Sequence, residues 1–551
     1  MNAKKFRAYS ALMGVSAAAV VLAVAELVAL VFLAGGSPLF AVGSLVIDGA
    51  PSWVKTLVID LFGAGDKAFL LTLLGMLILV GATVAGILEA RRPPLGVAVF
   101  ALATLIAVVA VVTRSGSSGL NGVPTILGAV CGVVVLRLGV QRFAAWSGEE
   151  HRRAQATVPA ATVPTATVPT ATVPAATVPV ASAPAPSALT IGGPPLERRK
   201  FLLFAIVSGA ASVIIIAGAR ALTTAAPAVT ALRKALTLPV AATPAAAIPA
   251  GAALDIGEIT PLVTPNADFY RIDTALQVPA INPDTWSLEI TGLVKNPIKI
   301  TLAELLAKPL VEHYATLACV SNEVGGNLIG NALWLGYPIR ELLKLAQPLS
   351  GADMVLSTSS DGFTAGTPLS VLQDEDTQAL LAVGMNGVAL PLEHGFPVRM
   401  VVPGLYGYVS ATKWVVSLEV TKFAESEGYW TPRGWNALGP VKLQSRIDTP
   451  AAGAKVGAGM VAVAGVAWSQ HVGVSKVEVQ IDDGPWVVAE LAESISADTW
   501  RQWVYRWQAT VGQHKIQVRA TDARGQTQSA VPRPVDPNGA EGYDSATVSV
   551  K

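Results

Sequence analysis

Long apolar runs dominate the first part of the chain, and short alternations of apolar and polar residues dominate the second. A membrane-spanning helix needs about 20 predominantly apolar residues, and five stretches before residue 220 approach or reach that length. The fourth is short and contains Pro124. The pattern predicts an all-α transmembrane bundle of about five spans, at Ala11 to Leu33, Phe69 to Leu88, Leu95 to Val112, Val123 to Leu136 and Phe201 to Gly218.

A further apolar segment, residues 38–63, is interrupted by Asp48, Lys55 and Asp60. Charged side chains are costly at the centre of a bilayer. We therefore interpret this segment as an interfacial or re-entrant loop between the first two spans. The region of the first four spans then covers residues 1–145.

Basic residues gather in alternate loops of this region. They precede the first span at residues 4–7, join the second span to the third at Arg91 and Arg92, and follow the fourth span from Arg137 to Arg153. The loops at 35–67 and 113–121 hold few positive charges. Because basic loops remain in the cytoplasm, five spans would place everything after the fifth outside it. We expect a multi-pass protein of the cell membrane with an extracytoplasmic second half.

A low-complexity linker, residues 146–197, separates the fourth span from the fifth. In it Thr-Val-Pro recurs every five residues from Thr157 to Thr177, a composition that favours an extended polyproline II spacer. The paired Arg198 and Arg199, one spacer residue and Phe201-Leu202 then resemble a twin-arginine export signal. A simple positive-inside anchor would also carry basic residues there. Residues 198–222 thus hold the signal-like segment and the fifth span, and residues 223–255 form a second linker.

From Arg446 to the last residue, apolar and polar positions alternate in short runs. The runs are separated by turn sequences at 482–484 and 522–525 that are rich in Asp and Gly. Period-two alternation with such turns is typical of a β-sandwich. We expect Trp500, Trp503 and Trp507 to serve core or interface packing rather than ligand stacking, since aromatic residues mostly contribute burial.

Composition and charge narrow the functional class. The chain is 52% apolar, 14% charged and carries a net charge of +1, which gives no electrostatic support for a nucleic-acid partner. Glu26 lies inside the first span, where a carboxylate could serve a proton path or a contact between helices; we favour instead a protonated or snorkelled side chain without such a role. The five histidines, at positions 151, 313, 394, 471 and 514, all lie outside the spans, so we predict no haem there.

Cys319 is the cysteine of the second half, and Cys131 lies in a predicted span. A lone buried cysteine is usually a small hydrophobic residue. An unpaired thiol outside the cytoplasm is nevertheless a liability unless something such as a metal holds it. Residues 311–318 read as a strand that ends at the cysteine, a polar loop with Gly325 and Gly326 follows, and residues 330–336 lead into a helix from Ile339.

Several ordered motifs accompany this cysteine, and together they resemble the sulfite oxidase family of molybdenum enzymes. The resemblance implies a mixed α+β molybdopterin-binding domain over residues 256–445. It also implies that residues 446–551 form an immunoglobulin-like dimerisation domain, with a possible homodimer. The motifs are Ala318 to Asn322, Met385-Asn386-Gly387, His394 to Arg399, Val402-Pro403-Gly404 and Gly407 to Trp414.

The resemblance also implies the site. Cys319 is expected to bind molybdenum, and Cys319 and Arg271 are the expected catalytic residues. Arg399 and Lys413 suit the phosphate of a pterin through charge-assisted bonds, His394 could donate to the cofactor, and backbone amides near residues 410–412 could line the anion. The expected cofactor-binding residues are Asn266, Phe269, Tyr270, Arg271, Cys319, Asp361, His394, Arg399, Ser410, Thr412 and Lys413.

Departures from the family pattern leave the substrate open. Glu323 and Val324 stand where sulfite oxidases carry arginines, Asp273 replaces a histidine, and Phe363 replaces a tyrosine of the substrate pocket. Carboxylates should repel sulfite, so sulfite oxidation would require Glu323 to lie outside the pocket. The bacterial protein-methionine-sulfoxide reductase subunit of the family also lacks the full arginine set, and is the alternative.

The chain is therefore expected to be a membrane-anchored oxidoreductase in which molybdenum-molybdopterin performs oxygen-atom transfer on a small oxyanion or a sulfoxide. Electrons would pass to or from a separate cytochrome or quinone-linked partner. A different class remains open: an anchored scaffold without cofactor that binds partners through its β-sandwich. The presence of Cys319, His394, Arg399 and Lys413 argues against a catalytic domain that has decayed into such a scaffold.

Overall fold

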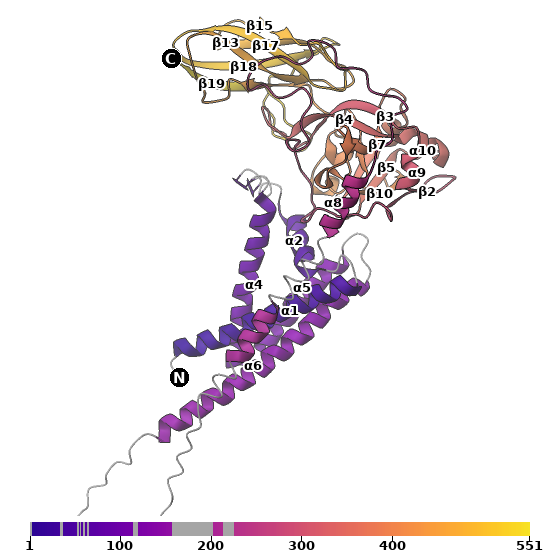
Figure 1. Cartoon of the computed structure of the whole chain (residues 1–551). Coiled ribbons are helices and arrows are strands. Elements are labelled where there is room, and N and C mark those ends of the chain that lie inside the picture. Colours follow the sequence, from indigo (N-terminus) through magenta and orange to yellow (C-terminus); the bar gives the residue numbers. More distant parts are fainter. Residues whose placement is uncertain are drawn as a thin grey trace, which may run out of the picture. The chain divides into compact units, whose positions relative to one another are not determined.

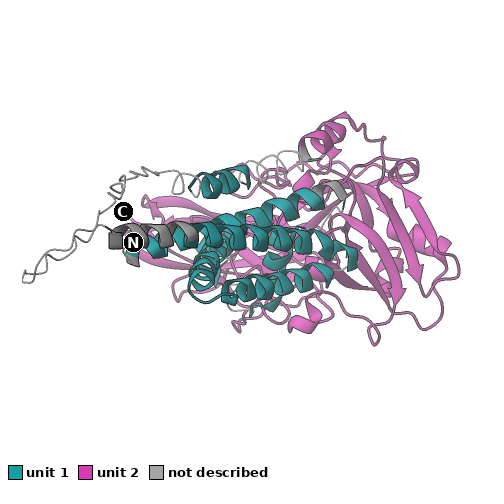
Figure 2. Ribbon diagram, turned by 90° about the horizontal axis from the view of Figure 1, so that it is seen from below, with its two compact units in different colours: residues 1–223 teal, residues 224–551 magenta. Residues whose placement is uncertain are grey.

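The computed structural model of the chain describes residues 3–32, 37–51, 54, 57–58, 61–62, 65–113, 119–156, 202–212 and 225–551. It forms two compact units, residues 1–223 and 224–551 (Figure 2). Three segments lie outside the described residues: the Thr-Val-Pro repeats, the paired arginines at 198 and 199, and residues 213–224. The predictions made for them therefore stay predictions.

The first unit is helical (Figure 1). Four of its helices are long and apolar enough to cross a membrane, and they match the first four predicted spans. The predicted fifth span is described only as a shorter apolar helix, Leu202–Ser212. Part of the predicted re-entrant segment forms helix α2. The elements are α1 (Ala3–Phe32), α2 (Pro38–Gly49), α4 (Asp66–Arg91), α5 (Leu95–Val112), η2 (Gly119–Gly122) and α6 (Val123–Ala156), so α6 includes the start of the predicted linker.

Small residues let these helices approach closely. A Cβ atom added to Gly14 of α1 would lie 1.9 Å from the Ala82 carbonyl oxygen of α4, and one on Gly86 would lie 2.2 Å from the Ser10 carbonyl oxygen. Interfaces between helices in membranes are enriched in such residues because packing, rather than exclusion of water, drives association. The segment 202–212 joins this bundle, since the Ser16 hydroxyl donates to the Ala205 carbonyl oxygen at 3.1 Å.

Two glutamate side chains of this unit connect neighbouring elements. Glu89 of α4 accepts a hydrogen bond from the backbone N–H of Val97, in the first turn of α5, and its other oxygen lies 3.0 Å from Arg137 Nε of α6. The Ser37 hydroxyl before α2 donates to Glu26 Oε1 at 2.6 Å. Glu26 of α1 thus contacts the residue that precedes α2.

The second unit opens with helix α8 (Ala225–Ala235), followed by two sheets that build a mixed α+β domain. The strands of the first sheet are β3 (Val311–Ala318), β4 (Ile329–Pro338), β7 (Leu380–Met385) and β8 (Val388–Ala389), with β9 (Arg399–Val401) paired to β7. The second sheet has the order β2 (Ile298–Thr301), β1 (Ser287–Gly292), β10 (Val415–Thr421), β5 (Met354–Ser359) and β6 (Thr364–Pro368). The helices are α9 (Leu302–Leu306), α10 (Ile339–Ala346) and α11 (Leu369–Gln373), with 3-10 turns η3 (Leu392–His394), η4 (Gly407–Val409) and η5 (Thr431–Arg433).

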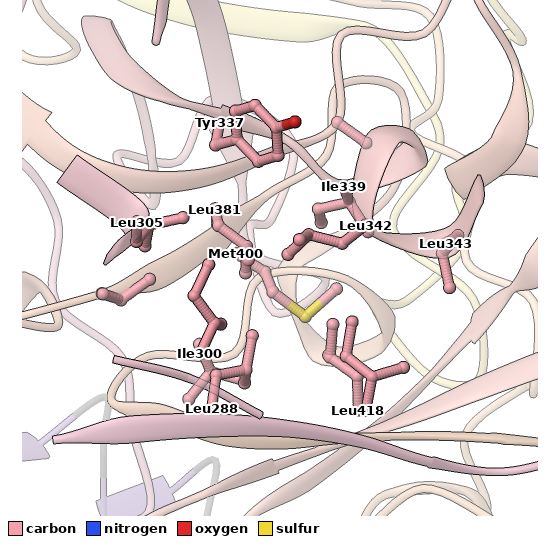
Figure 3. Close-up of a cluster of buried hydrophobic side chains, with 14 of the residues drawn as sticks. Leu288, Ile300, Leu305, Tyr337, Ile339, Leu342, Leu343, Leu381, Met400 and Leu418 are labelled. Carbon is pink, nitrogen blue, oxygen red and sulfur yellow. The ribbon is translucent and has the colours of Figure 1, made fainter. Parts of the chain in front are cut away.

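The predicted strand before Cys319 and the predicted helix from Ile339 are confirmed by β3 and α10. Successive side chains of a strand point to opposite faces, and β7 uses both. Leu381 contributes to a cluster with Ile300 and Leu418 from the second sheet (Figure 3). Leu380, on the other face, contributes to a second cluster with Trp334, Phe269 and Phe396. This second cluster lies under the candidate site.

Residues from 444 on form the predicted β-sandwich. One sheet has the order β11 (Gln444–Thr449), β13 (Gly459–Trp468), β17 (Arg501–Ala509) and β16 (Glu490–Leu491). The other has the order β12 (Lys455–Val456), β19 (Asp544–Val550), β18 (Gly512–Asp522), β14 (Val474–Ile481) and β15 (Val487–Val488). Trp503 and Trp507 fill its core. Trp500 packs in a cluster with Ala318 and Val320, the two neighbours of Cys319.

Candidate cofactor site around Cys319

Cys319 lies in a tight turn at the end of β3. Its backbone N–H donates to the Leu328 carbonyl oxygen at 2.9 Å, and its carbonyl oxygen accepts from Asn322 N–H at 3.1 Å. Only 9% of the residue is exposed. Burial raises the pKa of the thiol, while hydrogen bonds at Ser321 and the positive charge of Lys413 oppose the rise. A partner that stabilises the thiolate would therefore be favoured here.

Arg399 of β9 is buried without a carboxylate partner among the described residues. Its guanidinium donates only to backbone carbonyls, of Met400 at 3.3 Å, His394 at 3.2 Å and Ala411 at 3.4 Å. It lies 5.1 Å from the centre of the Trp334 ring. Burial lowers the pKa of Arg399 to about 10. Long bonds to neutral acceptors leave most of this charge uncompensated.

Lys413 is also buried, and it shares a carboxylate with Arg271. Lys413 Nζ donates to Asp273 Oδ2 at 2.7 Å, and Arg271 Nε donates to the same oxygen at 2.9 Å. Burial lowers the pKa of Lys413 to about 8, although Asp273 opposes the change. The Asp273 side chain is 4% exposed and pairs with two cations. The repulsion of sulfite expected from this residue is thus largely neutralised.

His394 connects the early segment to the cations. Its Nε2 lies 3.1 Å from the Asn266 carbonyl oxygen, and burial together with Arg399 lowers its pKa to about 4, so the ring is neutral. A carbonyl can only accept, which makes Nε2 the donor and Nδ1 an acceptor. This arrangement favours a ring that accepts a hydrogen bond from a ligand, rather than the donor expected from the sequence.

Asn266 and Phe269 hold this segment in place. Asn386, at the tip of the β7–β8 turn with φ of 51°, donates from Nδ2 to Asn266 Oδ1 at 2.7 Å. The Phe269 ring packs edge-on against His394, with 5.6 Å between ring centres. A Cβ on Gly330 would lie 2.7 Å from that ring, so β4 needs a glycine there. Asn386 was part of a recognised motif, but the sequence did not assign it a site role.

Two tyrosines complete the surroundings of the thiol. Burial raises the pKa of Tyr270, and the negative form of Cys319 raises it further, whereas Arg399 lowers it. Burial likewise raises the pKa of Tyr406, with a contribution from Cys319. Both hydroxyls are therefore neutral, and the Tyr406 hydroxyl oxygen accepts from Lys442 N–H at 3.4 Å. Tyr270 was predicted. Tyr406 was missed, although it stands between two recognised motifs, Val402 to Gly404 and Gly407 to Trp414.

The remaining predicted residues play internal roles in this structure. The Ser410 hydroxyl donates to the Tyr406 carbonyl oxygen at 2.9 Å, and the Thr412 hydroxyl lies 2.7 Å from that of Ser357. Both residues are fully buried. Asp361 Oδ1 accepts from Phe363 N–H at 3.2 Å and so stabilises its own turn. Glu323 is exposed to solvent.

The charge balance tests whether a molybdenum-pterin cofactor fits. Arg271 and Lys413 pair with one carboxylate, that of Asp273, and Arg399 pairs with no carboxylate among the described residues. Buried charge is unfavourable unless it is paired, so the two deeply buried cations suit an anion such as a phosphate. No group of three His, Cys, Asp or Glu side chains able to hold a metal occurs among the described residues. A metal at Cys319 would need further ligands from a cofactor, as a pterin dithiolene provides.

Comparisons with known proteins agree with this fit. Residues 275–430 match the oxidoreductase molybdopterin binding domain, and residues 444–518 match the bacterial Ig domain. The chain is 30% identical over 302 residues to mitochondrial sulfite oxidase from Homo sapiens, covering 46% of this chain and 55% of that protein. It is 28% identical over 311 residues to sulfite oxidase from Arabidopsis thaliana, covering 46% of this chain and 78% of that protein.

Among solved structures, the sulfane dehydrogenase SoxCD from Paracoccus pantotrophus is similar with a TM-score of 0.46 and 22% identity, covering 52% of this chain and 83% of that one. The chain spans about half the length of the human relative. The roles expected for all of the site residues remain predictions, and the matched range begins after the segment Asn266 to Arg271.

Proposed function

The chain belongs to the sulfite oxidase family of molybdopterin-dependent oxidoreductases, and from this premise we propose that it is a membrane-anchored enzyme that transfers an oxygen atom outside the cytoplasm. The observation that carries the proposal is the excess of buried positive charge at Arg399 and Lys413, close to a buried thiol. Such a pocket is unfavourable when empty, and a metal-pterin phosphate satisfies both features at once.

The bound cofactor would supply two-electron oxygen-atom transfer, and the protein would position it. Cys319 would bind molybdenum as a thiolate, and its proton would leave on binding. Arg399 and Lys413 would hold the phosphate, and Lys413 also favours the thiolate of Cys319. The side chain of Arg271 is 37% exposed, so its free N–H groups could orient an oxyanion substrate.

We propose sulfite as the first candidate substrate, because the curated relatives are sulfite oxidases and Glu323 is exposed. A sulfoxide is the second candidate. One observation favours it: Asp273 already occupies Nε of Arg271, which leaves fewer donors for an oxyanion. A neutral sulfoxide needs fewer positive charges than sulfite does.

Membrane anchoring rests on four helices long enough to span a bilayer, with the segment 202–212 as part of the fifth. Five spans with cytoplasmic basic loops would place the catalytic unit outside the cytoplasm. Electrons would then pass to or from a separate partner, a cytochrome or a quinone-linked protein. The immunoglobulin-like domain could mediate a homodimer.

The proposal is tested by expressing the full chain in a host that makes the cofactor and measuring molybdenum per chain, sulfite oxidation and reduction of methionine sulfoxide. We expect close to one molybdenum per chain and turnover of one substrate. Cys319→Ser should lower turnover at least 100-fold, while Cys131→Ser, the matched change at the chain's second cysteine, should not. A molybdenum content below about 0.1 equivalent per chain would favour the scaffold alternative.

Within the enzyme class, the two assays separate the substrates. Sulfite-dependent reduction of an artificial acceptor without sulfoxide turnover supports the first candidate. Oxidation of a reduced dye by methionine sulfoxide supports the second. Unchanged metal content and turnover in Cys319→Ser would contradict the whole assignment.

A further inference from the structure

The strand that carries Cys319 lies at the edge of its sheet. The sheet order is β3-β4-β7-β8, so β4 is the strand paired to β3. An edge strand leaves one row of backbone N–H and C=O groups without a partner in the sheet. In this protein those groups, near the end of β3, are bound by the C-terminal domain.

Thr316, three residues before Cys319, receives most of these contacts. Its backbone N–H donates to the Asp498 carbonyl oxygen at 3.0 Å, and its carbonyl oxygen accepts from Gln470 Nε2. Its hydroxyl accepts from Trp500 N–H at 2.9 Å. The residue is 1% exposed. Three groups of one residue are thus fixed by a domain that begins more than a hundred residues later in the sequence.

The carboxylate of Asp498 adds a charged contact at the same place. It lies between two histidines, with Oδ2 2.8 Å from Nε2 of His313 on β3 and Oδ1 2.9 Å from Nδ1 of His471. The other nitrogen of His471, Nε2, lies 3.0 Å from the carbonyl oxygen of Pro403. Pro403 stands between β9 and the turn η4, in the loop that leads to Tyr406. The cluster therefore joins two separate segments of the site to the sandwich.

His471 needs both of its protons in this position. One nitrogen faces a carboxylate and the other faces a carbonyl, and both partners can only accept. The Asp498 contact is accordingly an ion pair, and it raises the pKa of His471, with a smaller contribution from Asp374. The two histidines hold the pKa of Asp498 well below its usual range. These are the charged groups that act on the pair among the described residues.

We propose that Asp498, through its ion pair with His471, is a positioning residue for the site. Asp498 holds Thr316 in place, and Thr316 in turn fixes the position of Cys319 directly after the end of β3. The idea rests on the proposed function for its kinetic consequence, but the strand contact itself does not. A second connection on the other side of the cysteine loop, from Arg446 NH1 to the Gly326 carbonyl oxygen at 2.9 Å, holds the loop without a group that titrates near neutral pH.

The proposal predicts a particular pH dependence. The pKa of His471 is raised above its ordinary value, so the ion pair is complete below about 6.5 and is lost as the pH rises through the higher value in the folded protein. Loss of the proton leaves a lone pair facing an acceptor. Turnover should therefore fall on the alkaline side, and that fall should be absent or shifted in a variant without the imidazole.

The chain provides a matched control. Asp482 forms the same type of contact with His514, Oδ2 to Nδ1 at 2.8 Å, but its partners His514 and Lys515 both lie within the sandwich. Asp482→Asn thus removes a histidine–carboxylate pair from the same domain without touching β3. The test compares Asp498→Asn, His471→Gln and Asp482→Asn in the full, cofactor-bearing chain, with Asp498→Glu as the variant that restores the charge.

Hydrogen–deuterium exchange of residues 311–318 reports the strand contact independently of activity. We expect exchange at least 10-fold faster in Asp498→Asn and His471→Gln, and unchanged exchange in Asp482→Asn. Exchange equal to the wild type in both of the first two variants would overturn the proposal, whichever substrate the enzyme uses.

The catalytic consequence is read from kinetics and from the paramagnetic resonance of the reduced metal. In Asp498→Asn we expect molybdenum content within twofold of the wild type, kcat lowered about 10-fold or more with little change in KM, and a shifted metal signal. Asp498→Glu should recover part of kcat. A wild-type kcat, pH profile and signal in both Asp498→Asn and His471→Gln would also contradict a positioning role. If the wild type turned over neither candidate substrate, the proposed function would fail while exchange and the metal signal still decided this proposal.

Discussion

At the scale of single residues, Arg399 and Lys413 place positive charge where the polypeptide provides little to balance it. Arg399 donates to three carbonyls and Lys413 shares Asp273 with Arg271. A cation buried in this way destabilises the protein until an anion binds. The same side chains should therefore affect the empty and the loaded protein in opposite directions.

Arg399→Met tests this reversal. Without cofactor, we expect the variant to be more stable than the wild type by about 1–3 kcal/mol, because an unpaired buried charge is removed. In the loaded protein it should retain roughly 10-fold less cofactor, because charge-assisted bonds contribute about 1.5–3 kcal/mol. Thermal unfolding and molybdenum analysis are the measurements.

A control for that change is Arg446→Met. Arg446 is a buried arginine with its own carboxylate, Asp448, at 2.7 Å. Its removal should destabilise the protein in both states, since Asp448 would be left without its partner. Equal effects of the two substitutions on the empty protein would argue against an uncompensated charge at Arg399.

Lys413 predicts a pH effect on the empty protein. Its pKa is lowered to about 8 from 10.5, so between these values the unfolded chain binds a proton that the folded chain has released. The free energy of unfolding should thus increase as the pH rises from 8 to 10.5, by up to about 3 kcal/mol. Denaturant titrations of wild type and Lys413→Met, compared at each pH, isolate the contribution. A bound phosphate should reduce it, because an anion raises the pKa of the lysine.

The sequence indicated which residues belong to the candidate site, but it did not indicate which side chains pair with one another there. Arg399, Lys413 and His394 could be selected because they occur in ordered motifs. That Asp273 would pair with Lys413 as well as with Arg271 could not be foreseen, because residues 140 positions apart come together only in the fold. Tyr406 carried no signal of its own, since a tyrosine between two glycine-containing motifs is as easily a core residue.

At the scale of elements, close packing of α1 on α4 depends on glycine. Gly14→Ala would bring a methyl group to 1.9 Å from the Ala82 carbonyl oxygen, which the backbone must move to avoid. We expect a loss of about 1–3 kcal/mol, the usual cost of overpacking. The loss would lower the amount of denaturing detergent needed to separate the helices.

Gly81→Ala is the matched control, because nothing lies within 4 Å of a Cβ added to Gly81 in α4. Alanine favours a helix over glycine by about 1 kcal/mol, so this variant should be as stable as the wild type or more so. A similar loss in both variants would show that backbone propensity, rather than the contact with Ala82, controls the assembly.

The pattern of apolar residues predicted some elements and their boundaries better than others. The strand before Cys319, the helix at Ile339 and the strands of the sandwich could be predicted from their runs of apolar residues and the turn sequences between them. Helix α2 was expected as a loop because Asp48, Lys55 and Asp60 interrupt the apolar run, yet Pro38 at its first turn and the apolar residues after it suffice for a short helix. Helix α6 continues into the predicted linker, where most of residues 149–156 (Glu, Arg, Ala and Gln) are good helix formers.

At the scale of the whole molecule, the proposed membrane anchoring makes the number of spans decide on which side of the membrane the catalytic unit would lie. Four long helices leave residues 156 and 551 on the same side unless the segment that contains 202–212 also crosses. We expect it to cross. Alkaline phosphatase, which is active only outside the cytoplasm, should thus be inactive when fused after residue 156 and active after residue 551.

Cytoplasmic fluorescent-protein fusions at the same two positions give the complementary result. Inactive phosphatase at both positions would mean that the catalytic unit stays in the cytoplasm. In that case the proposed localisation fails, while the assignment of the cofactor site around Cys319 is unaffected.

Domain order could be predicted from the chain, but domain packing could not. Alternation indicates that Val466 and Trp468 of β13 share one face, without revealing what covers it. In the structure that face packs against Ala318 and Val320. A surface contact of this kind depends on complementary shapes, which a linear pattern of apolar residues does not encode.

One consequence concerns the order of synthesis. Gly325, in the cysteine loop, packs against Asp544 at the start of β19, and β19 pairs with β18 in the middle of its sheet. A ribosome adding about 5–20 residues per second needs on the order of ten seconds or more to travel from codon 319 to codon 550. During that interval the cysteine loop lacks its contact with Asp544. Loading of the prosthetic group must then wait for release of the chain, and a nascent polypeptide stalled before codon 544 would remain empty.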